Sequence, residues 1–418
     1  MRKNIEINNP DEGVLLKELE SRTDIKAERI KKLLALPDLT KKENSPVKII
    51  NDKIMELPMW RDFDVVDIPK IVSVQDDFDL LNTPVDHPSR RETDTYYLDQ
   101  TRILRTQMTV MWPYYFRDKE VLERLKTSGE VGSLSPGIVF RKDEIDRKHF
   151  PAFHQTDFLY VCRKDKRIIT LKELQDIQAD AVKAIFGDIE FRFLVDTFPF
   201  TDPSTQVEIN WGGNWIEITG AGLVHPNCLK NFGLDPEIYN GWAGTFGLDR
   251  VAMIKMGIPD IRILWSNDPK ITSQFKDINS KYKEVSKYPE TSRDISFVID
   301  KSINLNNYYE IVRDFAENLI EEVKLIDEYE DEEKFGKDKK SYTFRIIYRS
   351  PERTLTADEI NKEPQTKDPK YDGGNARKVA HRYPHQTGND IISRIFLEIN
   401  RRQHAQGDDR DAHNEHHH

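Results

Sequence analysis

The pattern of hydrophobic and polar positions divides the chain into stretches with different periods. Residues 1 to about 45 are charged, and their leucines and isoleucines recur at helical spacing, which predicts a helical N-terminal extension. From about 46 to 275, short apolar runs are separated by turns, and several alternate apolar with polar residues as half-exposed antiparallel strands do. We therefore predict a mixed domain with a helix over 171–185 and with strands near 96–98, 139–140, 158–161, 191–195, 207–209 and 215–218.

A second domain is predicted over 287–362, after a polar linker at 276–286. Apolar residues at helical spacing over 308–323 predict a helix, and β-rich runs predict strands at 293–299, 323–326 and 341–348. With a further helix after residue 356, the order strand, helix, strand, strand, helix fits a split βαβ sandwich of the ferredoxin type. Residues 363–418 are polar, so we predict a flexible tail and assign its terminal histidines no function.

Composition narrows the class of protein. The 418 residues are enough for about two to three domains, and 37% apolar with 33% charged residues is typical of a soluble protein. No apolar run approaches the roughly 18 residues that a membrane-spanning helix needs. Two cysteines, Cys162 and Cys228, are too few for a disulfide framework or a cysteine-based zinc site. A net charge of −10 does not point to RNA, although a local basic patch would suffice to bind it.

Residues 137–155 carry the most distinctive chemistry. Two β-rich runs, 139–140 and 158–161, flank a charged loop that begins at Arg141 and returns at Phe153, which predicts an antiparallel hairpin. A guanidinium matches the geometry of phosphate, and a phenyl ring offers a purine a flat surface. The chain has no G-x-x-x-x-G-K-[ST] and no G-x-G-x-x-G after a strand. We therefore predict a nucleotide clamp that is not a P-loop.

The pattern R-x-D-x-x-D-x-x-H-x-P-x-F-H-Q over 141–155 resembles motif 2 of class II aminoacyl-tRNA synthetases, in the form found in phenylalanyl-tRNA synthetases. Other stretches resemble, in order, that family's active-site entry, its pocket, its motif 3 and its anticodon-binding domain: 86–109, 197–227, 241–250 and 287–356. The resemblance implies an α+β fold. A class II synthetase antiparallel-sheet catalytic domain, at 46–275, would be followed by a ferredoxin-like anticodon-binding domain at 287–362.

The resemblance implies an ATP site with two catalytic arginines. Arg141 would bind the α-phosphate and the substrate carboxylate. Phe153 would stack on adenine, with Arg250 on the other face of the base and near the γ-phosphate. Glu217 would face the ribose or a Mg²⁺ ion, although on an alternating strand it could also simply face water. Two residues of the motif 2 loop would lie near adenine and the pyrophosphate: Asp143 and His149.

The resemblance also implies an amino-acid pocket. Phe198 and Phe200 would meet a substrate ring edge to face, with Ala243 at the floor. An ordinary core role is the alternative for the two phenylalanines, because they flank a proline. The substrate ammonium group would be bound by Gln155 and Asp157, with help from Thr109. Two more pocket positions follow from the same motifs: Gln107 and His154.

Some positions depart from the family pattern. Gln107 stands where the family usually has His, Asp157 and Asp249 stand where it usually has Glu, and Gly244-Thr245 replaces the usual Phe-Gly. We expect the lost ring at Gly244 to enlarge the pocket, and the shorter Asp157 to draw a carboxylate back by one methylene. Phenylalanine is still the expected substrate, because the Phe-Pro-Phe pair and the His-Gln pair of motif 2 are intact.

We therefore expect a single-chain synthetase of the organellar type, which ligates phenylalanine to tRNA(Phe) with ATP and Mg²⁺, as a monomer and without a membrane partner. Two alternatives are a class II synthetase for another aromatic amino acid and a non-catalytic paralogue that binds tRNA. The first residues contain acids and no apolar signal core, which favours the cytoplasm. The organellar architecture leaves a mitochondrion or plastid as the alternative compartment.

Overall fold

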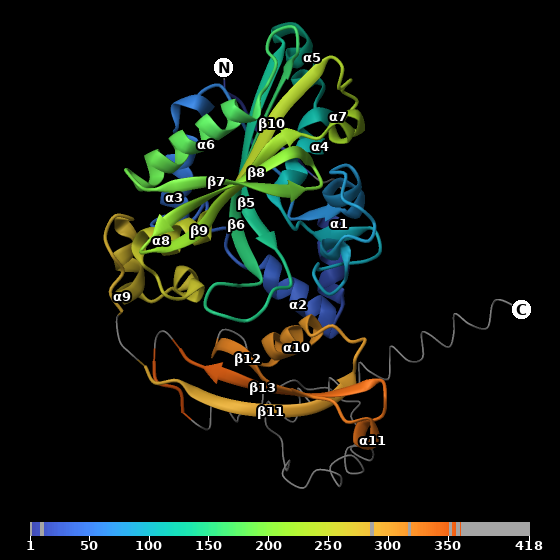
Figure 1. Cartoon of the computed structure of the whole chain (residues 1–418), viewed down its shortest axis with the longest axis vertical. Helices are drawn as coiled ribbons and strands as arrows, with labels where there is room; N and C mark the ends of the chain where they lie inside the picture. The colour runs from blue at the N-terminus through green and yellow to red at the C-terminus, as the bar shows by residue number, and fades with distance from the viewer. Residues whose placement is uncertain are drawn as a thin grey trace, which may run out of the picture. The chain divides into compact units, whose positions relative to one another are not determined.

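The computed structural model describes residues 2–8, 12–284, 288–316, 319–350, 353–356 and 360. The tail predicted at 363–418 and most of the helix predicted after residue 356 lie outside these residues. The chain forms two compact units, shown in Figure 1. The first unit comprises Met1–Lys142 and Pro151–Lys283, and the second comprises Asp143–Phe150 and Glu284–His418.

The first unit is built on an eight-stranded sheet in the order β1-β2-β5-β6-β10-β9-β8-β7. Every neighbouring pair from β5 to β7 in this order is antiparallel, whereas β2 pairs in parallel with both β1 and β5. The predicted antiparallel sheet is therefore confirmed. The strands are β1 (Asn4–Glu6), β2 (Asp64–Asp67), β5 (Glu130–Phe140), β6 (Ala152–Arg163), β7 (Phe191–Phe198), β8 (Thr201–Trp211), β9 (Asn214–Val224) and β10 (Tyr239–Gly247), with β3 (Ile71–Ser73) and β4 (Arg102–Leu104) in a separate pair.

Helices cover both faces of the sheet, with α3, α6 and α8 on one side and α4, α5 and α7 on the other (Figure 1). Helix α6 matches the helix predicted over 171–185. The helices of this unit are α1 (Glu12–Ser21), α2 (Ile25–Leu34), α3 (Pro46–Met55), α4 (Met111–Arg117), α5 (Lys119–Ser128), α6 (Leu171–Phe186), α7 (Pro226–Asn231), α8 (Leu248–Met256) and α9 (Pro269–Thr272).

Local sequence explains where these helices begin and end. Helix α5 starts at Asp118, whose carboxylate accepts hydrogen bonds from the backbone N–H groups of Glu120 and Val121. It ends at Gly129, which adopts a left-handed backbone with φ of 79° that a residue with a side chain rarely takes.

Strand β1, the first strand of the sheet, was not predicted, because the N-terminal stretch was expected to be helical throughout.

Each face of the sheet buries a different core. The face under α3, α6 and α8 carries an aromatic cluster in which Trp60 lies 5.2 Å from Phe158, centroid to centroid. Trp242 stacks on Tyr160 at 5.1 Å in the same cluster. The face under α4, α5 and α7 is aliphatic and aromatic and includes Val139, Leu159, Ala243, Met111, Trp112, Leu125 and Leu229. Because side chains alternate along each strand, neighbouring residues of β6 and β10 belong to opposite cores.

The second unit contains a three-stranded antiparallel sheet in the order β11-β13-β12. Helix α10 covers it, and the ring of Tyr308 lies 4.4 Å from that of Phe344. This order of strand, helix, strand, strand matches the predicted ferredoxin-like arrangement. The elements are β11 (Thr291–Asp300), α10 (Asn306–Ala316), β12 (Ile320–Tyr329), α11 (Glu332–Phe335) and β13 (Lys339–Tyr348).

The helix predicted over 308–323 was too long. Helix α10 ends at Ala316, and β12 already begins at Ile320, so that Val323 lies in a strand and pairs with Ile346 of β13. The apolar spacing at the end of this stretch fits the period of a helix and also that of a strand. Pairing of β12 with β13 decided for the strand.

Residues 143–150 form part of the second unit. The side chain of Ile145 is 8% exposed and packs in the core of this unit, and its carbonyl oxygen accepts a hydrogen bond of 2.9 Å from the backbone N–H of Val323. Arg147 Nε donates to Glu321 Oε1 at 2.8 Å, and Glu321 is almost fully buried. The loop therefore lies along the edge of β12 that does not pair with β13.

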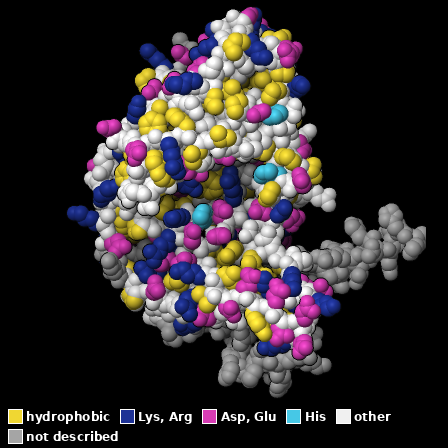
Figure 2. Space-filling model, viewed as in Figure 1, with side chains coloured by type: hydrophobic (Ala, Val, Ile, Leu, Met, Phe, Trp, Pro, Cys, Tyr) yellow, Lys and Arg dark blue, Asp and Glu magenta, His cyan; other side chains and the backbone are white. Residues whose placement is uncertain are grey.

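Basic and acidic side chains lie interspersed over the face shown in Figure 2, as expected from 63 lysines and arginines and 73 aspartates and glutamates. Within the described residues, no helix is both long enough and apolar enough to cross a membrane.

Candidate active site

The hairpin of β5 and β6 brings together two of the predicted nucleotide residues. Arg141 directly follows β5, and Phe153 lies on β6 opposite Val139. The Arg141 Nε–H donates to the carbonyl oxygen of Thr106 at 2.8 Å, and the guanidinium carbon lies 5.2 Å from the centroid of the Phe153 ring. The backbone bond and the cation–π contact orient the guanidinium beside the ring, as a clamp for a nucleotide requires.

Two further predicted residues, Glu217 and Arg250, meet where β9 approaches α8. Arg250 Nη1 is 3.4 Å from Glu217 Oε2, and both side chains are about half exposed, at 50% and 45%. An exposed pair of this kind contributes little to stability, so both charges can turn toward a ligand at little cost. Within the described residues, no group of three or more His, Cys, Asp or Glu side chains is gathered as for a metal ion. A lone carboxylate suits Mg²⁺, which is usually held by substrate phosphates and one or two carboxylates.

The two residues predicted from the motif 2 loop belong to the second unit. His149 Nδ1 lies 2.9 Å from Asp146 Oδ2. Arg313 donates to the carbonyl oxygens of Asp143 and Glu144, the second at 2.8 Å. A role for Asp143 and His149 near adenine stays a prediction.

Residues of the predicted amino-acid pocket form a row across one face of the sheet. Asp157 on β6 pairs directly with Thr245 on β10, which pairs with Gly220 on β9, so the three positions share a face. The ring of Phe198 lies over Gly220, because a Cβ at that glycine would come within 2.7 Å of the ring. This row therefore places an aromatic wall and a buried carboxylate on the same face, two strands apart.

The Asp157 carboxylate is fully buried and accepts three hydrogen bonds from its own chain. Trp112 Nε1 donates to Oδ1 at 2.7 Å, and the hydroxyls of Thr109 and Thr245 donate to Oδ2 at 2.9 and 2.6 Å. Burial raises the pKa of Asp157 to about 7, and the three donors offset only part of that rise.

Phe198 and Phe200 lie parallel, with ring centroids 5.9 Å apart and planes 5° apart. The rings of Phe200 and Trp112 meet edge to face, with centroids 5.7 Å apart and an interplanar angle of 82°. Trp112 therefore connects the aromatic pair to Asp157, because its ring contacts Phe200 and its N–H donates to the carboxylate. The floor position, Ala243, is fully buried on the same face of the sheet.

Comparison with known proteins decides what this site belongs to. Residues 30–275, well over half of the chain, match the family described as tRNA synthetases class II core domain (F). The chloroplastic/mitochondrial phenylalanine–tRNA ligase of Arabidopsis thaliana is 37% identical over 305 residues, which cover 71% of this chain and 68% of that protein. The chain belongs to the class II phenylalanyl-tRNA synthetases.

Other comparisons extend this result. Residues 286–366 match the ferredoxin-fold anticodon binding domain. The mitochondrial phenylalanine–tRNA ligase of Mus musculus is 34% identical over 337 residues, 71% of each chain. The phenylalanine–tRNA ligase alpha subunit of Nostoc punctiforme is 36% identical over 230 residues, 55% of this chain and 66% of that subunit. The relatives thus include both organellar enzymes and bacterial subunits.

Two positions expected in the synthetase pocket have other partners. His154 is fully buried on the opposite face of β6, where Nε2 accepts from the backbone N–H of Leu39 at 3.0 Å and Nδ1 lies 3.1 Å from Asp249 Oδ2. The structure therefore does not bring His154 together with the row on the other face, and its visible role is to hold the start of α8. Gln107 Nε2 donates to the carbonyl oxygen of Asp77 at 3.2 Å.

Gly244 does not enlarge the synthetase pocket, contrary to the expectation from sequence. It alternates with Ala243 and Thr245 and so faces the other core, where a Cβ would come within 2.5 Å of Phe158 Cζ. The ring of Phe158, its partner on β6, occupies the space that a side chain at position 244 would need. On the pocket face the change adds the side chain of Thr245 beside Asp157.

Sequence reasoning missed two residues of this synthetase site. Asp77 is fully buried, and its Oδ2 accepts from the N–H and the hydroxyl of Thr106 at 2.8 and 2.9 Å. Since the Thr106 carbonyl holds Arg141, Asp77 supports the clamp; burial raises its pKa to about 6. Trp112 was missed because it lies in an apolar run that is typical of core. For Asp77, the acidic run around it offers no signal that distinguishes it from a solvated turn.

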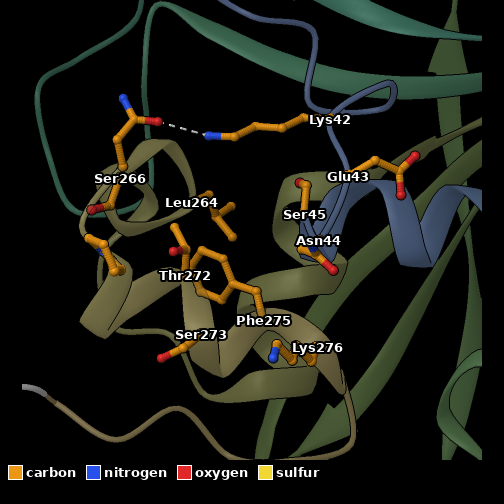
Figure 3. A pocket seen from close by; sticks show the side chains of 12 residues that line it. Lys42, Glu43, Asn44, Ser45, Leu264, Ser266, Thr272, Ser273, Phe275 and Lys276 are labelled. Atoms are coloured by element: carbon orange, nitrogen blue, oxygen red, sulfur yellow. Dashed lines mark hydrogen bonds between the residues drawn. The ribbon is translucent and has the colours of Figure 1, made fainter.

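A separate cavity of about 400 Å³ lies between the turn before α3 and residues 264–276 (Figure 3). None of the predicted site residues lines it. The hydroxyls at its wall are used locally, since Ser45 caps α3 and Thr272 donates to Asp268 O at 3.2 Å. We assign this cavity no part in the synthetase reaction.

Proposed function

We propose that this chain ligates phenylalanine to tRNA(Phe) through an enzyme-bound phenylalanyl-adenylate. One observation carries the proposal: Arg141 is oriented over Phe153 by a backbone carbonyl, while Asp157, Thr245 and the Phe198 ring share one face of the same sheet. A phosphate-binding fork and an aromatic pocket with a buried carboxylate suit a substrate that carries an aromatic ring, an ammonium group and a carboxylate.

In the first step, a carboxylate oxygen of phenylalanine attacks the α-phosphorus of ATP, the bond to the β-phosphate breaks, and pyrophosphate leaves. Arg141 would hold the α-phosphate and the carboxylate in line, and Arg250 would neutralise charge on the departing phosphates. Mg²⁺ would supply further positive charge to the phosphates, with Glu217 as its protein-side carboxylate. No side chain needs to act as a base, because the attacking carboxylate is already ionised.

In the second step, the terminal ribose of tRNA attacks the acyl carbon, and AMP leaves. The resemblance implies that the 2′-hydroxyl is the acceptor. The ferredoxin-like second unit would bind the anticodon. We further propose that the chain acts as a monomer, and the organelle names of several relatives favour the mitochondrial or plastid alternative for its compartment over the cytoplasm.

Amino acid-dependent ATP–pyrophosphate exchange tests the proposal, with phenylalanine, tyrosine and other aromatic amino acids as substrates. Exchange with phenylalanine, followed by charging of tRNA(Phe), is the expected result. If only a different amino acid supports exchange, the chain is a synthetase for another aromatic amino acid. If the chain binds tRNA without exchange with any amino acid, the non-catalytic paralogue is favoured.

Two variants sharpen this test. Arg141→Ala should abolish exchange, because the oriented guanidinium at the phosphate site is lost. Arg163→Ala is the matched control, because Arg163 lies at the end of β6, at the opposite end of the β5–β6 hairpin, in a surface ion pair with Asp165. Equal activity of the two variants would remove Arg141 from the mechanism.

A further inference from the structure

The side chain of Thr245 contacts the fully buried carboxyl group of Asp157. Its hydroxyl lies 2.6 Å from Asp157 Oδ2, the shortest of the three hydrogen bonds that this carboxylate accepts. Above its pKa of about 7 the Asp157 carboxylate is ionised and can only accept hydrogen bonds, so the hydroxyls of Thr245 and Thr109 then both donate their single proton to it. The hydroxyl of each threonine can then act toward a ligand only as an acceptor, through its oxygen lone pairs.

Exposure distinguishes the groups of this network. Asp157 is fully buried, Thr109 is 2% exposed and Trp112 is 1% exposed, whereas Thr245 is partly exposed. A ligand on this face of the sheet therefore meets the side chain of Thr245 before it meets the carboxylate. When Asp157 is ionised, its charge still acts on the ligand through the low-dielectric interior.

Thr245 lies next to the aromatic wall on the same face of the sheet. Thr245 is the direct cross-strand neighbour of Gly220, over which the Phe198 ring lies. A substrate ring that contacts Phe198 would therefore have its polar end within reach of the next strand. The lone pairs at that point select a hydrogen-bond donor, and the α-ammonium group is the donor that a free amino acid offers.

We propose that Thr245 binds the α-ammonium group of the amino acid through its hydroxyl oxygen, and that Asp157 is a positioning residue that fixes the direction of that hydroxyl. This inference rests on the proposed function, and it reassigns the ammonium contact from Asp157 to Thr245. The aspartate accepts the proton of that hydroxyl and so fixes its direction, and the threonine makes the contact.

The test compares Thr245→Val, which keeps the shape of the side chain and removes its hydroxyl, with Thr245→Ser, which keeps the hydroxyl. The readouts are the KM for phenylalanine in pyrophosphate exchange and competitive inhibition by two analogues. Phenylalaninol keeps the ammonium group and lacks the carboxylate, whereas 3-phenylpropanoate keeps the carboxylate and lacks the ammonium group.

We expect Thr245→Val to raise the KM for phenylalanine and the inhibition constant of phenylalaninol by about tenfold or more, as for a lost hydrogen bond to a charged group. The KM for ATP and the inhibition constant of 3-phenylpropanoate should change by less than about twofold, and Thr245→Ser should resemble the wild type. If Thr245→Val does not fold, Thr245→Ala against Thr245→Ser makes the same comparison.

Two results would overturn the inference. Equal weakening of both analogues would mean that Thr245 only shapes the pocket, and unchanged binding of phenylalanine and phenylalaninol would mean that the ammonium group lies elsewhere. Failure of the proposed function is a separate outcome, because the wild-type protein would then show no exchange with phenylalanine at all.

Discussion

Replacement of Asp157 by asparagine should change how the stability of the first unit depends on pH. The pKa of this buried carboxyl is raised from 3.8 to about 7 in the folded state. Between these values the folded chain holds a proton that the unfolded chain has lost, so the free energy of unfolding falls as pH rises. The contribution of this proton to the free energy of unfolding is largest below pH 4, and it is fully lost once the pH has passed about 7.

The magnitude follows from the size of the shift. About three pKa units correspond to about 4 kcal/mol over the whole range, of which about 3 kcal/mol falls between pH 5 and pH 8. In Asp157→Asn this titration is absent. The unfolding free energy of the wild type minus that of the variant should therefore decrease by about 3 kcal/mol over this window.

Urea unfolding followed by tryptophan fluorescence measures this difference. All six tryptophans lie between residues 60 and 265, so the signal reports the first unit alone. Asp176→Asn is the control, because Asp176 lies in an exposed pair with Lys172 on α6. A wild-type-minus-variant difference that is flat in pH, or that rises with pH, would refute the argument that burial dominates the pKa of Asp157.

Two further predictions concern packing. Gly244→Ala should destabilise the first unit by roughly 1–3 kcal/mol, because the new Cβ would come within 2.5 Å of Phe158 Cζ; urea unfolding measures this, and a neutral result would contradict the assigned face. Glu321→Gln should weaken the contact with Arg147 and speed amide hydrogen exchange in 143–150, measured by mass spectrometry, without a change in tryptophan emission. Unchanged exchange would mean that the buried pair does not hold the loop.

Local sequence was sufficient for much of the fold and for the nucleotide residues. The helix predicted over 171–185 is present as Leu171–Phe186, because its apolar spacing, its Thr170 cap and Gly187 all agree. The motif 2 pattern identified the family because it is long and chemically varied. Arg141 and Phe153 could be paired from sequence, since a hairpin brings the two ends of one loop together.

What the sequence determined by itself was therefore the class of fold, the family and the residues whose partners lie nearby along the chain. Tertiary structure alone decided that Gly244 and His154 face away from the row of pocket residues, that Asp157 is held by Trp112 and Thr245, and that 143–150 pack with the second unit. The physical reason is that strand register sets which face a side chain occupies, and register depends on pairing between distant segments.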